Sequence, residues 1–363
     1  MNSMKYVDEF RNRHSAQAIA ERIRRVVGTT KSYTFMEVCG THTMNIFKFG
    51  IRRMLPENVR LISGPGCPVC VTPNEFIDKA IELSAREGVI IATFGDMVRV
   101  PGSRSSLQEE KAKGRDIRVV YSTLDALEFA RKNPRKEIVF LGVGFETTAP
   151  TVASSIIEAK RRRMKNYAVL CAHKTMPNAL KELSRDKDID IDGFILPAHV
   201  STIIGSRPYE FLVKDYGKRC VIAGFEPLDI LQGILMLVSQ PAPSLEIEYS
   251  RVARPEGNKI AQEMIKDVFE EVSSIWRGIG VIKRSGLRLR RRYADFDAEA
   301  RFNIRLPQSR ERSGCICGAV LKGVKTPSEC NLFRRVCTPE NPIGPCMVSS
   351  EGTCSAYFKY GER

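Results

Sequence analysis

Short apolar segments alternate with stretches of helical periodicity between residue 33 and about residue 240. Each apolar segment is rich in β-branched side chains, and a turn containing Gly, Pro, Thr or His follows it. This alternation is typical of a parallel β-sheet covered by helices. The predicted strands are residues 33–38, 59–63, 89–94, 117–122, 137–143, 167–172, 193–198 and 220–225.

These eight strands exceed one small sheet, so we predict an α/β fold with two similar parallel-sheet domains. A polar segment with a helix-stopping proline, RKNPRKE, separates the fourth strand from the fifth. The predicted domains are therefore residues 31–130 and 131–240, and the first carries the CxxC loop.

The pattern changes after the second predicted domain. Residues 258–280 have helical periodicity and are predicted to form one helix that ends at Gly278 or Gly280. The proline-rich segment before them, residues 239–257, is predicted to cross between domains. Beyond residue 280 the chain is irregular and dense in cysteine, which predicts a small third domain held together by its ligands.

The composition limits the class of protein. A chain of 363 residues with 43% hydrophobic side chains can form packed cores, and its apolar runs are shorter than the roughly 18 residues of a membrane span. The N-terminus MNSMKYVDEFRNRHSAQ lacks the apolar region of a secretory signal, so we expect a cytoplasmic protein. In a cytoplasmic protein, eleven cysteines indicate catalysis or metal binding rather than a disulfide framework.

A net charge of +15 raises the question of an anionic partner. Much of the charge lies in two runs, residues 160–163 (KRRR) and residues 283–292 (KRSGLRLRRR). The first run ends a predicted helix, where cations suit the helix dipole. The second run is a candidate contact surface, but no aromatic stacking platform or groove-reading motif surrounds it, so nucleic acid is not an expected partner.

Most unusual side chains follow the predicted strands, where the ligand sites of parallel sheets lie. In GPGCPVC, Cys67 and Cys70 have CxxC spacing, and the following VTPNEF predicts a helix with Thr72 as N-cap and Glu75 closing a capping box. A helix N-terminus favours thiolate, so the pair is predicted to be redox-competent. The alternatives are half of a metal site and inert packing.

The first strand ends in EVCGTHT, with Cys39 and His42 three residues apart. Cys39 can be a nucleophile with His42 as its base, or a soft ligand for low-valent iron. Both interpretations remain open from these residues. Cys171 and Cys220 are predicted to be core residues. His173 and His199 are either ligands or structural histidines.

Six cysteines crowd the last 49 residues, and no two of them have CxxC spacing. Four follow the spacing C-x14-C-x6-C-x16-C, which suits an iron–sulfur cube better than the paired knuckles of a zinc ribbon. Zinc is the alternative. The predicted ligands are Cys315, Cys330, Cys337 and Cys354, with Cys317 as an alternative to Cys315 and Cys346 as an extra thiol.

Six motifs in order resemble the HypD family of hydrogenase maturation factors: CGTHT, GPGCPVC, GFETTAP, PAHVSTIIG, GFEPLDIL and CTPENPIGPCMVSSEGTC. The similarity runs from about residue 30 to the C-terminus. It implies two α/β domains and an iron–sulfur domain built from residues 1–30 and 241–363 that holds a 4Fe-4S cluster. It also implies a scaffold on which the iron of NiFe hydrogenase receives cyanide and carbonyl ligands.

The resemblance further implies partners and residue roles. HypC is the expected chaperone partner, HypE the expected cyanide donor, and the hydrogenase large subunit is reached through HypC. Cys39 ligates the Fe(CN)2CO unit together with a HypC cysteine, near His42. Cys67 and Cys70 form the redox-active pair, the four tail cysteines hold the cluster, and Glu351 matches a functional position. An iron–sulfur and dithiol reductase without a scaffold role is the alternative function.

Overall fold

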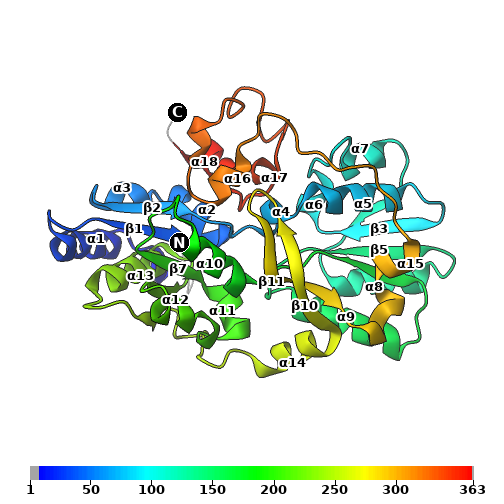
Figure 1. Ribbon diagram of the computed structural model, residues 1–363, viewed down its shortest axis with the longest axis horizontal. Helices are drawn as coiled ribbons and strands as arrows, with labels where there is room; N and C mark the ends of the chain where they lie inside the picture. The colour runs from blue at the N-terminus through cyan, green and yellow to red at the C-terminus, as the bar shows by residue number, and fades with distance from the viewer. Residues whose placement is uncertain (1–7, 362–363) are drawn as a thin grey trace.

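All eight predicted strands are present in the computed structural model, which describes residues 8–361, and they form two parallel sheets (Figure 1). Sheet A has the strand order β2-β1-β7-β8-β9 and sheet B the order β4-β3-β5-β6. The strands of sheet A are β1 (Tyr33–Glu37), β2 (Val59–Ser63), β7 (Gly193–Pro197), β8 (Arg219–Ala223) and β9 (Leu245–Ile247). Those of sheet B are β3 (Val89–Thr93), β4 (Ile117–Val119), β5 (Glu137–Gly142) and β6 (Tyr167–Cys171).

The sheets group these strands differently from the predicted division at residue 130. The chain leaves sheet A after β2, builds the whole of sheet B, and returns so that β1 pairs with β7 in the register Phe35↔Gly193. RKNPRKE is only the turn between α8 (Thr123–Lys132) and β5 within sheet B. Periodicity identifies a strand but not its partner, and a parallel strand can pair across a long crossover.

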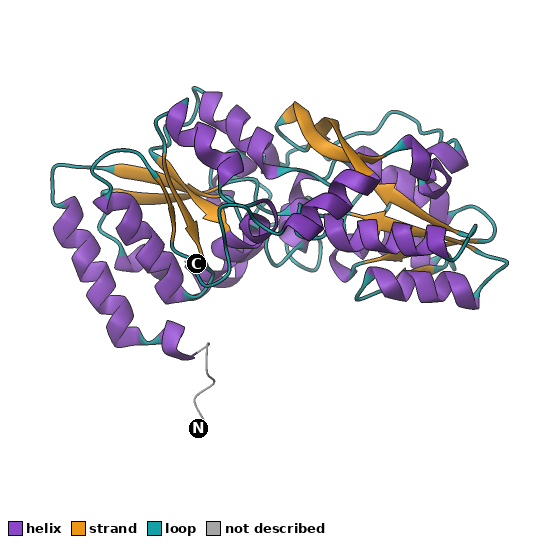
Figure 2. Cartoon of the chain, turned by 90° about the horizontal axis from the view of Figure 1, so that it is seen from below, coloured by secondary structure: helices purple, strands orange, loops and turns teal. Residues whose placement is uncertain are grey.

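Helices cover both sheets, giving the two lobes that are seen from below in Figure 2. Lobe A comprises sheet A with α1 (Arg13–Val27), α2 (Gly40–Lys48), α3 (Ile51–Met54), α10 (Met176–Arg185), α11 (Ala198–Ile204), α12 (Glu210–Lys214) and α13 (Pro227–Ser239). Lobe B comprises sheet B with α5 (Asn74–Ser84), α6 (Gly95–Val98), α7 (Leu107–Ala112), α8, α9 (Ala149–Arg161), α14 (Lys259–Val268) and α15 (Ala298–Phe302).

The N-terminal helix joins lobe A rather than the cysteine-rich tail. Helix α1 packs on α13, and its buried Ile23 and Val27 share one apolar core with Phe35 of sheet A. The resemblance groups residues 1–30 with the C-terminal region, whereas the apolar face of α1 is buried on lobe A. Residues 1–7 lie outside the described residues.

The predicted helix of residues 258–280 is wrong in its second half. Helix α14 ends at Val268, and the next residues form an antiparallel hairpin of β10 (Phe269–Trp276) and β11 (Gly280–Leu289). The basic run lies largely on β11, where Arg284 and Arg288 form salt bridges with Glu271 and Glu270 across the hairpin. Much of its charge therefore has a structural partner.

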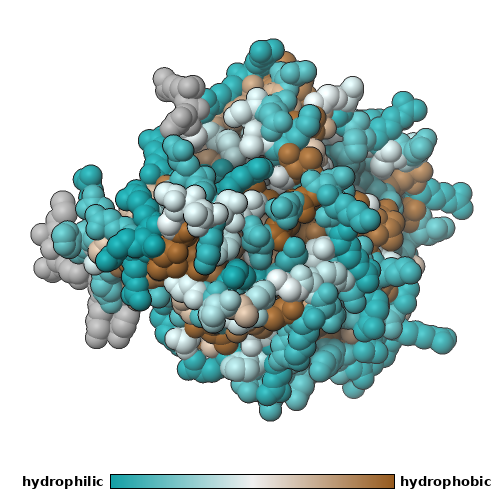
Figure 3. All heavy atoms as spheres, turned by 60° about the vertical axis from the view of Figure 1, so that its left-hand side comes forward, coloured by the Kyte–Doolittle hydropathy of each residue, from teal (hydrophilic) through white to brown (hydrophobic). Residues whose placement is uncertain are grey.

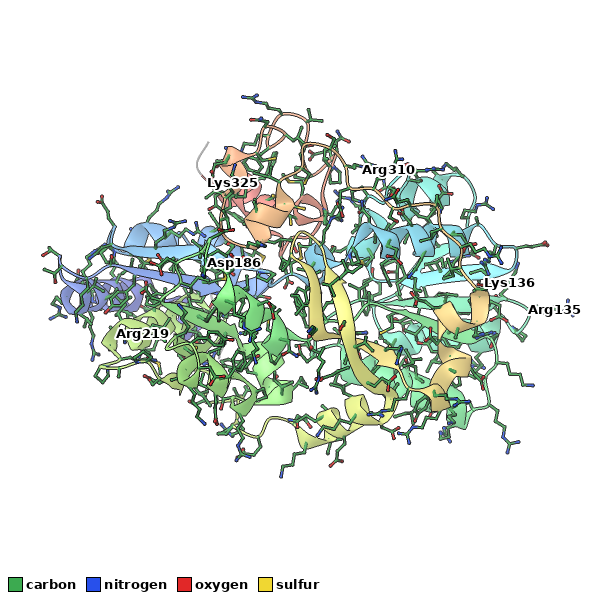
Figure 4. All side chains as sticks on the ribbon, viewed as in Figure 1. Arg135, Lys136, Asp186, Arg219, Arg310 and Lys325 are labelled. Atoms are coloured by element: carbon green, nitrogen blue, oxygen red, sulfur yellow. A yellow bond between two sulfur atoms is a disulfide. The ribbon has the colours of Figure 1, made fainter. Side chains whose placement is uncertain are left out.

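The cysteine-rich tail forms the smaller unit at the top of Figure 1. Its elements are α16 (Cys317–Leu321), α17 (Pro345–Val348), α18 (Thr353–Tyr360) and the 3₁₀ turn η4 (Pro327–Glu329). Helix α18 packs on α2, and α17 packs on the short helix α4 (Pro68–Val71). A salt bridge from Lys322 to Asp186, which Figure 4 labels beneath the tail, also joins it to lobe A.

The remaining 3₁₀ turns are η1 (Asp8–Arg11), η2 (Arg207–Tyr209) and η3 (Arg291–Phe296). Figure 3 shows apolar patches interspersed among hydrophilic side chains on the side of lobe A. Within residues 8–361, no helix combines the length and apolar character that crossing a membrane requires.

Candidate functional site

Cys39 lies where the first strand of sheet A turns into a helix. It is the N-cap residue of α2, and its carbonyl accepts the Thr43 amide hydrogen bond at 3.0 Å. Burial raises the pKa of Cys39 to about 12, and the charge of Glu351 adds to the rise. The free thiol is therefore protonated at neutral pH and loses its proton only when something electrophilic, such as a metal ion, binds the sulfur.

The CxxC loop lies directly against this turn. The Gly40 amide donates to the Gly66 carbonyl at 3.0 Å. A Cβ added to Gly66 would lie 2.3 Å from the Cys39 nitrogen, so only glycine permits this approach. The structure thus brings the predicted CxxC loop and Cys39 to one edge of sheet A.

Cys67 and Cys70 are joined by a disulfide and are both buried. Cys67 is the N-cap residue of α4, and its sulfur accepts the Cys70 amide hydrogen bond at 3.2 Å. The predicted helix start was misplaced: Thr72 ends α4 with its hydroxyl on the Pro68 carbonyl, and α5 begins at Asn74. The predicted capping box with Glu75 is therefore absent: α5 starts after Pro73, and no side chain caps its N-terminus.

His42 is fully buried on α2, above the end of β8. Its Nε2 lies 2.9 Å from the Gly224 carbonyl and 3.1 Å from the Ala223 carbonyl, so Nε2 carries the hydrogen and donates it. Burial lowers the pKa of His42 to about 4, and Nδ1 is buried without a partner. His42 is thus a neutral ring rather than a charged group, and it packs at a tilt on Phe225 with 4.7 Å between the ring centroids.

Glu351 reaches the Cys39 turn from the tail. The Thr41 hydroxyl donates to its Oε1 at 2.6 Å, and a Cβ on Gly40 would lie 2.4 Å from the Glu351 Cβ. Burial raises the pKa of Glu351, and the Thr41 hydrogen bond partly opposes the rise. A carboxyl group that lies 312 positions after Cys39 in the sequence is therefore part of the site at this edge of sheet A.

Two buried glutamates near the site were missed by sequence reasoning. Glu37, at the end of β1, accepts the Thr43 hydroxyl at 2.8 Å, and burial raises its pKa to about 8. Glu146, in the GFETTAP loop of sheet B, accepts the Met176 amide at 2.8 Å, and burial raises its pKa to about 7. A strand pattern makes Glu37 look like an outward polar residue, and the GFE motif that contains Glu146 is the signal that could have identified this residue.

Tyr209 links the two lobes electrostatically and was also missed. It is fully buried in the turn η2 of lobe A. Burial raises the pKa of Tyr209 well above its ordinary value, and the charges of Glu146 and Cys39 both contribute. Lobe B therefore supplies a carboxyl group to the same buried region that contains the Cys39 thiol.

The six tail cysteines all line one small cavity, together with apolar side chains such as Val320, Leu332 and Met347. The lining cysteines are Cys315, Cys317, Cys330, Cys337, Cys346 and Cys354. Hydrogen bonding connects Cys317 to Cys315 and to Cys346. The Ile343 amide donates to the Cys337 sulfur at 3.4 Å. All four predicted cluster ligands thus face one space, and so do both extra thiols.

This set of six thiols contains enough sulfur ligands for an iron–sulfur cluster. Among residues 8–361, no three His, Cys, Asp or Glu side chains are arranged as a single-ion site. A zinc ion holds each thiolate at about 2.3 Å and draws four of them together, whereas each ligand of a 4Fe-4S cube binds a different iron atom. The lining of the cavity by all six thiols is compatible with the four thiolate ligands of such a cube.

The two other cysteines and His199 lie outside the Cys39 turn and the tail cavity. Cys220 is fully buried in β8, as predicted for a core residue. Cys171 is half-buried at the end of β6, where its sulfur lies 3.5 Å from the His173 Nδ1 and donates to the Leu287 carbonyl at 3.2 Å. The His199 ring packs at a tilt on Phe225, with 4.1 Å between the ring centroids.

Comparison with known proteins identifies the family. The family model described as "Hydrogenase formation hypA family" (HypD) matches residues 14–361. The chain is 49% identical to the hydrogenase maturation factor HypD of Cupriavidus necator, covering 99% of this chain and 97% of that protein. It is 46% identical to the HypD of Rhodobacter capsulatus, covering 99% and 98%, and 45% identical to that of Escherichia coli K12, covering 99% of both. This chain therefore belongs to the HypD family of hydrogenase maturation factors.

Proposed function

We propose that this protein is the scaffold on which the Fe(CN)2CO unit of NiFe hydrogenase is assembled, and that it uses its disulfide and its tail cysteines to supply electrons. The observation that carries the proposal is the contiguity of three sulfur sites. The Cys39 turn contacts the CxxC loop at Gly66, and the CxxC helix α4 contacts α17 of the tail. Family membership supports the role in hydrogenase maturation.

The iron unit is cargo, and we assign its binding to Cys39. Thiolate donation raises the electron density that cyanide and carbonyl ligands require on ferrous iron. Because the pKa of Cys39 is raised to about 12 by burial, binding of iron must displace the thiol proton. We assign Glu351 as the proton acceptor, since its charge acts on Cys39 and its carboxylate lies against Gly40 and Thr41.

His42 holds the α2 start in place. Its Nε2 proton stays on the Ala223 and Gly224 carbonyls, and its low pKa keeps the ring neutral at physiological pH. An uncharged ring above the Phe225 side chain leaves the charge balance of the iron unit to Cys39 and its neighbours. We therefore assign His42 a positioning role.

The tail cysteines Cys315, Cys330, Cys337 and Cys354 are the proposed ligands of a 4Fe-4S cluster. Such a cluster would supply single electrons. Reduction of the Cys67–Cys70 disulfide takes two electrons and two protons and yields two thiols, so two successive transfers are needed. Cys346 lies on α17, which packs on α4, and thus occupies the space between the two centres.

The proposed partners follow from the same assignment. An iron atom on one half-buried cysteine needs further ligands, and a HypC cysteine is the proposed second thiolate. HypE is the proposed cyanide donor, and the hydrogenase large subunit is the proposed recipient through HypC.

The alternative function, a dithiol reductase that acts on a disulfide or small molecule, predicts turnover by the isolated chain.

The test of the proposed electron path replaces Cys67 and Cys70 by alanine, singly and together, with Cys220→Ala as the matched control. We expect hydrogenase maturation in a complemented deletion strain to be lost in all three variants while the cluster spectrum is unchanged. Full maturation by the double variant would reject the electron path.

A further inference from the structure

The tip of the β10–β11 hairpin lies between the CxxC helix and the tail. The Arg277 amide donates to the Val71 carbonyl at the end of α4, at 2.9 Å. Gly278 has a φ of 73°, and a Cβ there would lie 2.1 Å from the Gly318 Cα. The turn is thus pressed against α16, which begins at the thiol Cys317.

Arg277 carries a buried charge at this tip. The residue is only 4% exposed. Its Nε and Nη2 donate to Glu311 Oε2 at 3.0 and 2.5 Å, and Nη2 also donates to Asn74 Oδ1 at 2.5 Å. Nη1 is buried without a partner. The Asn74 side-chain amide in turn donates to the carbonyl of Arg310. Figure 4 labels Arg310 on the segment that runs from lobe B to the tail.

The carboxylate opposite Arg277 neutralises it only in part. The Glu311 side chain is 58% exposed, so water screens its charge, whereas the guanidinium is desolvated. A buried cation with an orphan N–H group needs further negative charge. The cavity is the nearest place for that charge, because the hairpin turn that carries Arg277 contacts Gly318, the residue directly after the cavity thiol Cys317.

We propose that Arg277 is a positioning residue that sets the reduction potential of the cluster held by the tail cysteines. This inference rests on the proposed function. Adding one electron adds one negative charge next to a fixed, desolvated cation, which stabilises the reduced form and raises the potential. Glu311 acts in the opposite direction, because its charge offsets that of Arg277.

The test is a redox titration of the anaerobically purified full chain, followed by the electron paramagnetic resonance signal of the reduced cluster. Arg277→Gln removes the charge, Arg277→Lys keeps it, and Glu311→Gln removes the opposing charge on an exposed side chain. The matched control is Arg284→Gln, an exposed arginine of the same hairpin whose salt bridge is with Glu271.

We expect Arg277→Gln to lower the equilibrium constant for reduction at least about tenfold, equivalent to about 59 mV for one electron. Glu311→Gln should raise it, and Arg277→Lys and Arg284→Gln should stay near the unsubstituted protein. If Arg277→Gln and Glu311→Gln both titrate as the unsubstituted protein does, the role of Arg277 is rejected while the proposed function stands. If the unsubstituted chain shows no cluster signal at all, the proposed function and this inference both fail.

Discussion

The edges of the two sheets carry the same pair of residue types but differ in what covers them. At the edge of sheet A, Cys39 is half-buried and faces the CxxC loop and Glu351 of the tail. At the edge of sheet B, Cys171 is also half-buried, beside His173 at 3.5 Å, but its thiol is bonded to the Leu287 carbonyl of the hairpin.

This difference separates the proposed iron ligand, Cys39, from a cysteine whose thiol is bonded within the fold, Cys171. In both places burial raises the thiol pKa to about 12, so acidity does not distinguish Cys39 from Cys171. The covering element does: the hairpin satisfies Cys171, whereas the tail brings a carboxyl group to Cys39. Function follows from the side chains that surround a cysteine in the fold rather than from the Cys and His pair alone.

The largest expected effect is the loss of maturation when Cys39, but not Cys171, is replaced. Cys39→Ala should abolish hydrogenase maturation, because the iron unit loses its thiolate ligand, whereas Cys171→Ala should leave maturation within about twofold. Hydrogenase activity in extracts of a complemented deletion strain measures both. Equal losses in the two variants would mean that the two edges are not functionally distinct.

Glu351 is expected to have the next largest effect. Glu351→Gln keeps a hydrogen-bond acceptor for Thr41 but removes the proton acceptor, so maturation should slow by about 10²-fold, at the lower end of general base contributions. Glu329→Gln, a capping residue on the same tail, is the control. An unchanged rate in Glu351→Gln would leave this carboxyl group with a packing role.

Whether the β10–β11 hairpin protects the Cys171 thiol can be tested by removing a buried side chain of the hairpin. Leu287 is 6% exposed, and Leu287→Ala should cost about 3 kcal/mol of unfolding free energy because it removes buried apolar volume. Alkylation of Cys171 in the native protein should become faster. The control is Val281→Ala on the same strand, where the side chain is 69% exposed. Equal alkylation rates in both variants would show that the hairpin does not protect this thiol.

The smallest expected effect concerns the buried carboxyl group of lobe B. The pKa of Glu146 is raised by burial to about 7, from an ordinary value near 4.3. Its protonated form favours the folded state, so its stabilising contribution is complete below about pH 4.3 and is lost as the pH rises through about 7. The loss should approach roughly 3 kcal/mol.

Glu146→Gln should remove this part of the pH dependence, since the amide can still accept the Met176 hydrogen bond. Urea unfolding at pH 5 and pH 8 compares the two proteins. A wild-type stability difference that persists unchanged in Glu146→Gln would assign the effect to other groups, such as Glu37.

The sequence predicted the strands and the loops that follow them because alternation and turn residues are local signals. The structure brings the CxxC loop and Glu351 to the Cys39 turn, and the six tail cysteines to one cavity. The pairing of β1 with β7 was not predictable in this way, because it joins segments about 160 residues apart across a second sheet.

The hairpin was missed for a specific reason. Val268, Val272 and Ile275 are spaced as on one face of a helix. In the structure a register shift between Val272 and Ser274 interrupts the two-residue period of the strand, so the helical spacing seemed to continue. Arg277 was missed with it, since its importance depends on the tip of this hairpin reaching the tail.

The most direct test of the account is the infrared spectrum of the anaerobically isolated full chain in complex with the HypC chaperone. We expect cyanide and carbonyl stretching bands in the iron-loaded complex, and their loss in Cys39→Ala. An iron-loaded complex without these bands would contradict the scaffold function.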